Sequence, residues 1–293
     1  MAKGLDVVAL GGNAIIPAGG RGTIDEQRDL TSYAMKQVAE LIASGRKVVL
    51  THGNGPIVGN IVERNEAVKD RIPPMPLDIC GADSQGGIGY MLQQCLRNEV
   101  ELRNLPSQVV AIVSQVVVDI DDEAFEYPTK PIGQFYTEEK AVELEKEKGW
   151  AMRNDADRGF RRVVPSPRPL EIVEAEVIKR LLDAGTVVIA VGGGGIPVVR
   201  EEGGLRGIEA VIDKDRAAAA LAKETRAERL IILTGVEEVY VGFGSPEQRP
   251  LGKVRLSEIK ELHESGEFPP GSMGPKIEAA IEFLEKGGRE VII

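Results

Sequence analysis

Six short runs of β-branched and aliphatic residues are spaced along the chain, separated by longer amphipathic or alanine-rich segments. Each run is too apolar for a half-solvated strand, so it is predicted to be buried on both faces. The predicted strands are residues 6–10, 47–51, 109–113, 186–190, 229–234 and 290–293. The predicted helices are residues 26–43, 84–103, 172–184, 216–224, 256–264 and 275–285. This alternation predicts an α/β fold, a three-layer α/β/α sandwich around a mostly parallel open sheet.

Composition narrows the class of protein. Aromatic residues make up only 4% of the chain, so the core is expected to consist mainly of Val, Ile, Leu and Ala. The net charge of −10 argues against nucleic acid as a partner, because nucleic-acid binders normally carry a basic excess. Two cysteines without metal-type spacing fit a reduced compartment. The apolar run at the N-terminus is too short for a signal peptide, and no stretch approaches the length of a membrane span, so no membrane partner and a cytoplasmic location are expected.

One stretch, residues 119–169, departs from the strand and helix alternation. It is rich in Pro, Lys, Arg and aromatic residues, and it contains a predicted helix at residues 138–148. We interpret it as an inserted subdomain that protrudes beside the sheet; the alternative is a long surface loop with one helix. Loops of this length inside compact domains are usually functional or disordered. If the insert is functional, it is expected to act as a mobile lid.

Glycine-rich segments follow three of the predicted strands. They are Gly11-Gly12-Asn13, Gly53-Asn54-Gly55 and the run of four glycines at residues 192–195. In a parallel sheet, the carboxyl ends of the strands meet at one edge, and glycines there let backbone N–H groups cradle anionic oxygens. A tight turn is the simpler explanation for each loop alone. Together they indicate a site for several anionic groups.

Two other nucleotide signatures are excluded. The chain contains no G-x-x-x-x-G-K-[ST] phosphate loop. The glycines at positions 53–59 resemble a dinucleotide fingerprint, but a dehydrogenase needs a second strand with an acidic end about twenty residues on. Residues 70–76, with three prolines, cannot form that central strand.

Three lysines stand in constrained contexts beside Pro, Gly or Asp: Lys130, Lys214 and Lys276. Phosphoryl transfer depends on positioning and charge neutralisation, which such lysines can supply. Solvated surface lysines are the alternative for each one. The two histidines, His52 and His263, form no convincing catalytic triad. This suits an acceptor that is already an anion and needs no general base.

Several of these segments, taken in order, resemble the carbamate kinase family, part of the amino acid kinase superfamily. The segments are residues 9–14 (ALGGNA), 51–56 (THGNGP), 84–86 (SQG), 88–90 (IGY), 128–131 (PTKP), 161–167 (RRVVPSP), 192–198 (GGGGIPV), 211–215 (VIDKD) and 271–276 (GSMGPK). They cover nearly the whole chain, and their common order makes the resemblance specific. It implies the amino acid kinase fold with a protruding subdomain.

The resemblance also implies an activity, reversible phosphoryl transfer between ATP and carbamate to give ADP and carbamoyl phosphate, as in ammonia and arginine metabolism. Mg²⁺ would enter with the nucleotide, without a metal site on the protein. Residues 1–185 would form the carbamate-binding lobe, residues 186–293 the nucleotide-binding lobe, and the protein would be a homodimer.

Site residues follow from the same resemblance. The predicted catalytic residues are Lys130, Lys214, Lys276 and Asp215. The predicted phosphate- and acceptor-binding residues are Gly11, Gly12, Asn13, Gly53, Asn54 and Gly55. The predicted nucleotide-binding residues are Gly194, Gly195, Asp213, Thr234, Met273 and Gly274.

Two alternative functions remain open from the sequence. One is another carboxylate kinase of the superfamily, of the acetylglutamate or aspartate type. It is disfavoured by the insert and by Ala9, because many superfamily members carry a lysine there that Lys130 would replace. The other is a non-catalytic nucleotide-binding protein on the same scaffold, which the three lysines argue against. The chain ends at Ile293, directly after a predicted strand, where family members usually continue.

Overall fold

The computed structural model describes residues 3–16, 22–154, 159–269 and 273–293. Six strands form one parallel sheet in the order β15-β12-β1-β2-β9-β3. Their bounds are β1 Lys3–Leu10, β2 Arg46–His52, β3 Val109–Ala111, β9 Val187–Ile189, β12 Arg229–Leu233 and β15 Glu290–Ile292. All six predicted strands are thus confirmed, and they are the six members of this sheet.

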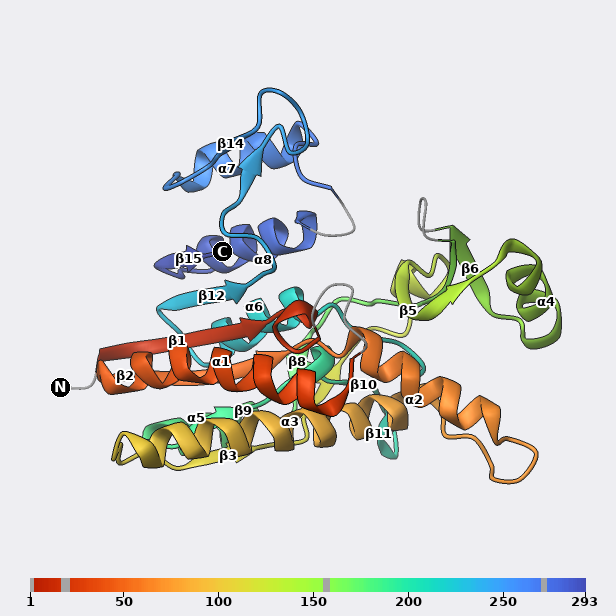
Figure 1. The fold of residues 1–293 in the computed structure, drawn as a ribbon, viewed down its shortest axis with the longest axis horizontal. Coiled ribbons are helices and arrows are strands. Elements are labelled where there is room, and N and C mark those ends of the chain that lie inside the picture. The colour runs from red at the N-terminus through yellow and green to blue at the C-terminus, as the bar shows by residue number, and fades with distance from the viewer. Residues whose placement is uncertain (1–2, 17–21, 155–158, 270–272) are drawn as a thin grey trace.

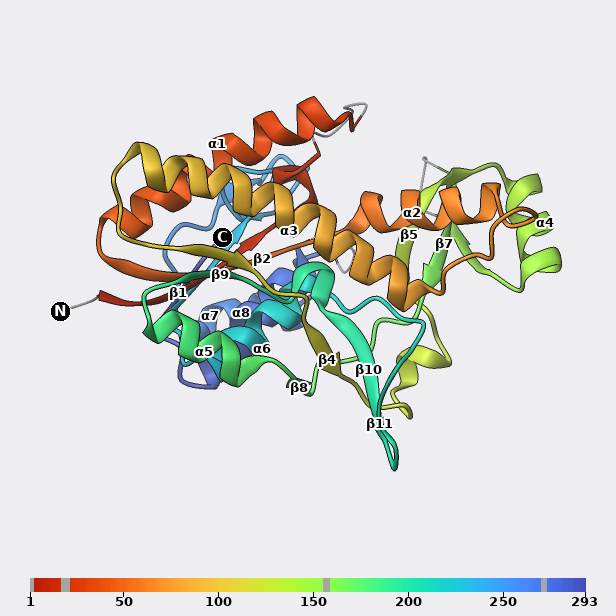
Figure 2. The ribbon, with the colours of Figure 1, turned by 90° about the horizontal axis from the view of Figure 1, so that it is seen from below.

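Helices cover both faces of the sheet (Figure 2). On one face lie α1 (Ile24–Ala43) and α3 (Leu77–Leu102), and on the other lie α5 (Ala175–Asp183), α6 (Lys214–Glu224) and α8 (Gly274–Glu285). Alternate residues of β1 enter opposite cores, because successive side chains of a strand point to opposite faces. Val7 and Ala9 pack towards α6, whereas Val8 and Leu10 pack towards α1 and α3. The predicted three-layer sandwich is confirmed.

A second sheet flanks the first in the order β11-β10-β4-β8. Its strands are β4 (Gln115–Val117), β8 (Glu171–Ile172), β10 (Ile196–Glu201) and β11 (Gly204–Gly207), and the last two form a projecting hairpin (Figure 2). The helix predicted from residue 172 begins only at Ala175, because Glu171 and Ile172 belong to β8. Near the C-terminus, α7 (Leu256–Glu264) packs on α8, and the short pair β13 (Tyr240–Val241) and β14 (Arg249–Pro250) is flanked by Val239 and Leu251, which join the same apolar cluster.

The insert is a subdomain and not a loop with one helix. It contains an antiparallel sheet in the order β5-β7-β6, formed by β5 (Lys130–Tyr136), β6 (Ala151–Asn154) and β7 (Phe160–Val164). The predicted helix is present as α4 (Glu138–Lys148). Figure 1 shows this subdomain projecting at one end of the molecule beside α2 (Gly55–Ala67), a helix that the sequence patterns did not predict.

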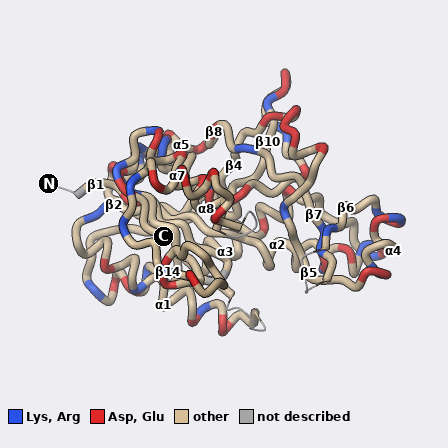
Figure 3. Tube along the Cα trace, turned by 90° about the horizontal axis from the view of Figure 1, so that it is seen from above, with Lys and Arg blue, Asp and Glu red and all other residues tan. Residues whose placement is uncertain are grey.

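The surface mixes the two signs of charge. Figure 3 shows acidic and basic residues interspersed along the described chain, including α4 and its neighbours. Within the described residues, no helix combines the length and apolar character that crossing a membrane requires.

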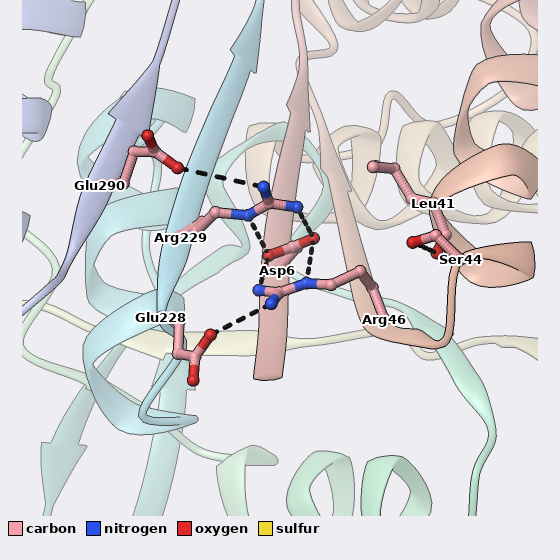
Figure 4. A network of polar contacts seen from close by, with 7 residues as sticks. All are labelled: Asp6, Leu41, Ser44, Arg46, Glu228, Arg229 and Glu290. Carbon is pink, nitrogen blue, oxygen red and sulfur yellow. Dashed lines mark hydrogen bonds and ion pairs between the residues drawn. The ribbon is translucent and has the colours of Figure 1, made fainter. Parts of the chain in front are cut away.

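A buried carboxylate joins the three central strands at their amino ends (Figure 4). Asp6 on β1 has no exposed surface and accepts hydrogen bonds from Arg46 on β2 and Arg229 on β12. The guanidinium of Arg229 donates to both carboxylate oxygens, at 2.8 and 2.6 Å. Burial alone would raise the pKa of Asp6, but the two arginines outweigh it and hold this pKa below its ordinary value. Glu228 and Glu290 pair with the arginines from outside.

We expect Asp6→Asn to lower the free energy of unfolding by roughly 3 kcal/mol, because two guanidinium groups then face each other without the charge that pairs them. The matched control is Glu228→Gln, whose side chain is 43% exposed. It should cost less than about 1 kcal/mol, as exposed ion pairs do. Urea unfolding of both variants measures the difference, and equal effects would contradict the structural role of Asp6.

Candidate active site

The glycine segments lie at one edge of the sheet, as the strand order requires. β1, β2 and β9 are neighbours or next neighbours, and each runs directly into one of these segments. Backbone bonds fix the loops to adjacent strands: the N–H of Gly11 donates to Leu233 at 3.1 Å, and the N–H of Gly53 donates to Leu10 at 3.0 Å. The predicted common edge is therefore present.

Three lysines from distant parts of the sequence meet two carboxylates at this edge. Lys130 Nζ lies 2.5 Å from Asp213 Oδ2. Lys276 Nζ lies 3.1 Å from Asp215 Oδ2, and Lys214 donates to the other oxygen of Asp215. Lys130 comes from β5 of the subdomain, Lys214 and Asp215 begin α6, and Lys276 lies in the first turn of α8. The structure thus brings together all four predicted catalytic residues.

Asp213 has a structural reason for its place. It is the N-cap of α6, and its carboxylate accepts from the backbone N–H groups of Asp215 at 2.9 Å and Arg216 at 3.4 Å. Burial opposes its ionisation, but Lys130 and Lys214 outweigh burial and hold the pKa of Asp213 well below its ordinary value. Asp213 is therefore a carboxylate that neutralises one cation of the cluster while it begins the helix.

Lys214 is the most deeply enclosed of the three lysines. Burial is the largest cause of its lowered pKa; Asp215 opposes that effect and the charge of Lys276 adds to it. Two lysines therefore share one carboxylate that is only 3% exposed. Like charges held this close favour the arrival of a further anion.

Open backbone donors lie next to these cations. A Cβ added at Gly53 would stand 3.1 Å from Cδ of Lys214 and 3.7 Å from the backbone nitrogen of Gly12, so the two loops and the lysine are in contact. The N–H groups of Gly12, Asn54 and Gly55 find no acceptor among the described residues. Asn54 and Gly55 stand at the N-terminus of α2, and the N-terminus of a helix favours negative charge. Cations and amides together form an anion site.

The four glycines at residues 192–195 are required by packing. A Cβ at Gly192 would meet the imidazole of His52 at 2.2 Å, and one at Gly193 would meet the side-chain amide of Asn54 at 2.3 Å. At Gly194 a Cβ would meet the carbonyl of Ile212 at 2.3 Å, and at Gly195 it would meet Val116 at 2.3 Å. The N–H groups of Gly194 and Gly195 donate within the turn. Any contact of these two residues with a nucleotide therefore needs atoms other than their N–H groups.

The other predicted site residues lie at the same edge or beside it. Thr234 follows β12, and Met273 is the N-cap residue of α8. The N–H of Gly274 donates to the carbonyl of Pro269 at 2.9 Å. The side chain of Asn13 lies outside the described residues.

The loops are supported by hydrogen bonds that the sequence did not predict, and one of the residues involved, Ser114, was missed altogether. Ser114 is fully buried; its hydroxyl accepts from the N–H of Val191 at 3.0 Å, while its own backbone pairs with the side chain of Gln85. Asn54 donates to Ser84 at 3.0 Å. No pattern in the sequence marks Ser114, whereas the start of α2 carried a usable signal, since Pro at the first helical turn is a common helix start.

Comparison with known proteins places this arrangement in a family. The model of the amino acid kinase family matches residues 5–293. The carbamate kinase of Pyrococcus horikoshii is 50% identical over 98% of this chain and 92% of its own length. The carbamate kinase of Staphylococcus haemolyticus is 49% identical over 96% of this chain and 90% of its own length. The chain belongs to the amino acid kinase family.

Solved structures agree with the sequence relatives. Carbamate kinase from Giardia lamblia bound to AMP-PNP superposes with a TM-score of 0.92 at 47% identity, covering 99% of this chain and 92% of that one. The predicted resemblance, the amino acid kinase fold and the enzyme class, a kinase, are confirmed. N-acetylglutamate synthase from Neisseria gonorrhoeae, at 16% identity and a TM-score of 0.57, shares the fold alone.

His52 yields a pH prediction. Burial lowers its pKa to about 4 from 6.5, although its hydrogen bond with the Gly53 carbonyl opposes the shift. Between pH 6.5 and pH 4, His52 is protonated in the unfolded chain but stays neutral in the folded protein. The free energy of unfolding therefore decreases as the pH falls from 6.5 to 4. The loss should reach roughly 3 kcal/mol. Urea unfolding across this range should show a shallower pH slope for His52→Asn, and an unchanged slope would contradict a buried neutral imidazole.

Proposed function

We propose that this protein is a carbamate kinase, which transfers the γ-phosphoryl group between ATP and carbamate, giving ADP and carbamoyl phosphate. The observation that carries the proposal is the convergence of Lys130, Lys214 and Lys276 on Asp213 and Asp215 beside the open amides of two glycine loops. Relatives at about half identity over nearly the full chain bear this name. Among the described residues of the cluster there is no histidine, and both carboxylates are paired with lysines, which suits an acceptor oxygen that is already anionic.

The chemistry proposed for the cluster is charge neutralisation. As the phosphoryl group passes between two oxygens, negative charge spreads over its equatorial oxygens, and ammonium groups fixed in a water-poor site stabilise that charge. Lys214 and Lys276 are held in place by Asp215, so little reorganisation is needed. The N–H groups of Gly12, Asn54 and Gly55 are proposed to bind the acceptor and the transferring group, together with Gly11, Asn13 and Gly53.

Mg²⁺ is proposed to enter with the nucleotide. No group of three or more His, Cys, Asp or Glu side chains within the described part of the chain is arranged to hold a metal ion. Asp213 and Asp215 face lysines instead. We therefore propose substrate phosphates as the main ligands of the ion; in kinases Mg²⁺ is usually bound by such phosphates together with one or two carboxylates.

The finer predictions are kept as part of the proposal. Gly194, Gly195, Asp213, Thr234, Met273 and Gly274 are proposed to line the nucleotide side. The division into lobes of residues 1–185 and 186–293 stays a prediction. One sheet runs across this division, because β9 pairs with β2 and β3.

A homodimer is supported by exposed apolar side chains on α3, among them Tyr90 and Leu102. A cytoplasmic location stays a prediction.

The test measures the formation of ATP from ADP and an acyl phosphate in a coupled assay. Carbamoyl phosphate should be used in clear preference to acetylglutamyl phosphate and aspartyl phosphate. Preference for either of the latter would indicate another carboxylate kinase of the family. Absence of turnover with all three, combined with nucleotide binding, would indicate a non-catalytic nucleotide-binding protein.

Replacing any one of Lys130, Lys214 and Lys276 by Ala should lower turnover by roughly a hundred- to a thousandfold, since each removes one preorganised cation. Lys→Arg should restore little, because a planar guanidinium does not replace a compact ammonium in a tight site. Circular dichroism and melting temperature check the fold. Lys179 on α5, whose side chain is 36% exposed and pairs with Glu176, supplies the control, and Lys179→Ala should retain full turnover. Near-normal turnover in the site variants would refute the cluster's role.

A further inference from the structure

The protruding subdomain touches α2 through two glycines. A Cβ added at Gly59 on α2 would lie 2.2 Å from both the Cα and the nitrogen of Gly133 on β5. Real Cβ atoms never come so close, so the two backbones meet where neither residue has a side chain. Gly133 has a φ of +73°, within an irregularity of β5 between Ile132 and Tyr136. Its carbonyl accepts from Arg161 on β7 at 2.9 Å.

Two further contacts lie along the same face of α2. Tyr136 donates to Glu63 at 2.7 Å, and Lys148 at the end of α4 pairs with Glu66. Glu63 and Glu66 are four and seven residues after Gly59, which is the spacing of one helix face. The subdomain is thus attached to α2 over about two turns, from its root to its outer helix.

The root of the subdomain also has a small apolar core. Val58 of α2 and Ile132 of β5 are buried together with Val164 of β7 and Val211. Lys130 lies two residues before Ile132, and Asp213 lies two residues after Val211. The N–H of Val211 donates to the carbonyl of Pro165 at 2.9 Å. This core therefore sets the distance between Lys130 and Asp213.

We infer that α2 and the protruding subdomain form one rigid unit, and that Gly59 and Gly133 are positioning residues that determine where Lys130 reaches the site. The inference rests on the proposed function and deepens it. Lys130 is three residues before Gly133 on one strand, and the open amides of Asn54 and Gly55 are five and four residues before Gly59. Any movement of the subdomain carries the N-terminus of α2 with it. The subdomain is then not an independent lid, because the anion-binding loop and Lys130 shift together.

Gly59→Ala tests the positioning role. A methyl group at residue 59 must push β5 away from α2, so kcat for ATP formation from carbamoyl phosphate should fall by roughly 10- to 100-fold, while the KM for ADP changes little. The matched control is Gly81→Ala on α3, a helical glycine whose Cβ would meet nothing within 4 Å. It should keep the wild-type kcat, since alanine favours a helix.

A double-mutant cycle with Lys130→Ala separates positioning from general damage. If Gly59 acts through Lys130, then Gly59→Ala should lower kcat little further once Lys130 is absent. The same loss of kcat in both backgrounds would overturn the positioning role. Inactivity of the wild-type enzyme would instead count against the proposed function, and the rigid unit would then be judged by hydrogen exchange alone.

Hydrogen exchange can be measured on two milder variants, Glu63→Gln and Tyr136→Phe. This experiment does not depend on enzyme activity, nor on whether the Gly59→Ala variant folds. Both keep the side-chain shape and weaken or remove the hydrogen bond between α2 and β5. Amides of residues 55–67 and 130–136 should exchange faster together if α2 and the subdomain are one unit. Faster exchange in 130–136 alone, with 55–67 as in the wild type, would show that the subdomain moves independently and would overturn the inference.

Discussion

The structure depends on the parallel pairing of β1 with β2 on one side and β12 on the other. These strands are buried on both faces, so their polar backbone groups must be satisfied within the sheet. Parallel pairing also divides the chemistry between the two ends of the strands. At the amino ends Asp6 ties the three strands together through two arginines. At the carboxyl ends the chain leaves the sheet through glycine loops, and the charged cluster lies there.

That cluster carries an excess of positive charge. Three ammonium groups share two carboxylates, Asp213 and Asp215, and the latter serves two lysines at once. Burial makes the mutual repulsion of Lys214 and Lys276 more costly, which agrees with the lowered pKa of Lys214. A phosphate would supply the missing negative charge and hydrogen-bond acceptors. The carboxylates therefore position the lysines without fully neutralising them, and a polyanion is the ligand that such a balance favours.

The main sheet could be predicted because each strand is buried on both faces and is therefore a short apolar run in the sequence. Helix α2 has no comparable pattern: within it only Val58 and Gly59 are buried, so it lacks an apolar stripe. The second sheet was missed because β8 has only two residues and β11 is largely exposed, so neither leaves an apolar run in the sequence. Local context singled out the three lysines, but their meeting is a property of the folded topology, since they are separated by many residues and lie on different elements.

The position of Ala9 bears on why one cation of the cluster comes from the protruding subdomain. Ala9 is the last residue but one of β1, followed by Leu10 and the first glycine pair, and it is fully buried against the α6 side of the core. We propose that Lys130 takes the place of a lysine that the resemblance to the kinase superfamily places at this position. A lysine on a central strand is positioned by the sheet itself, whereas one on a protruding subdomain needs a separate attachment. The contact between Gly59 and Gly133 and the apolar core beneath it supply that attachment. Because α2 also begins in the glycine loop of residues 53–55, the element that holds the distant lysine is the one that presents the open amides.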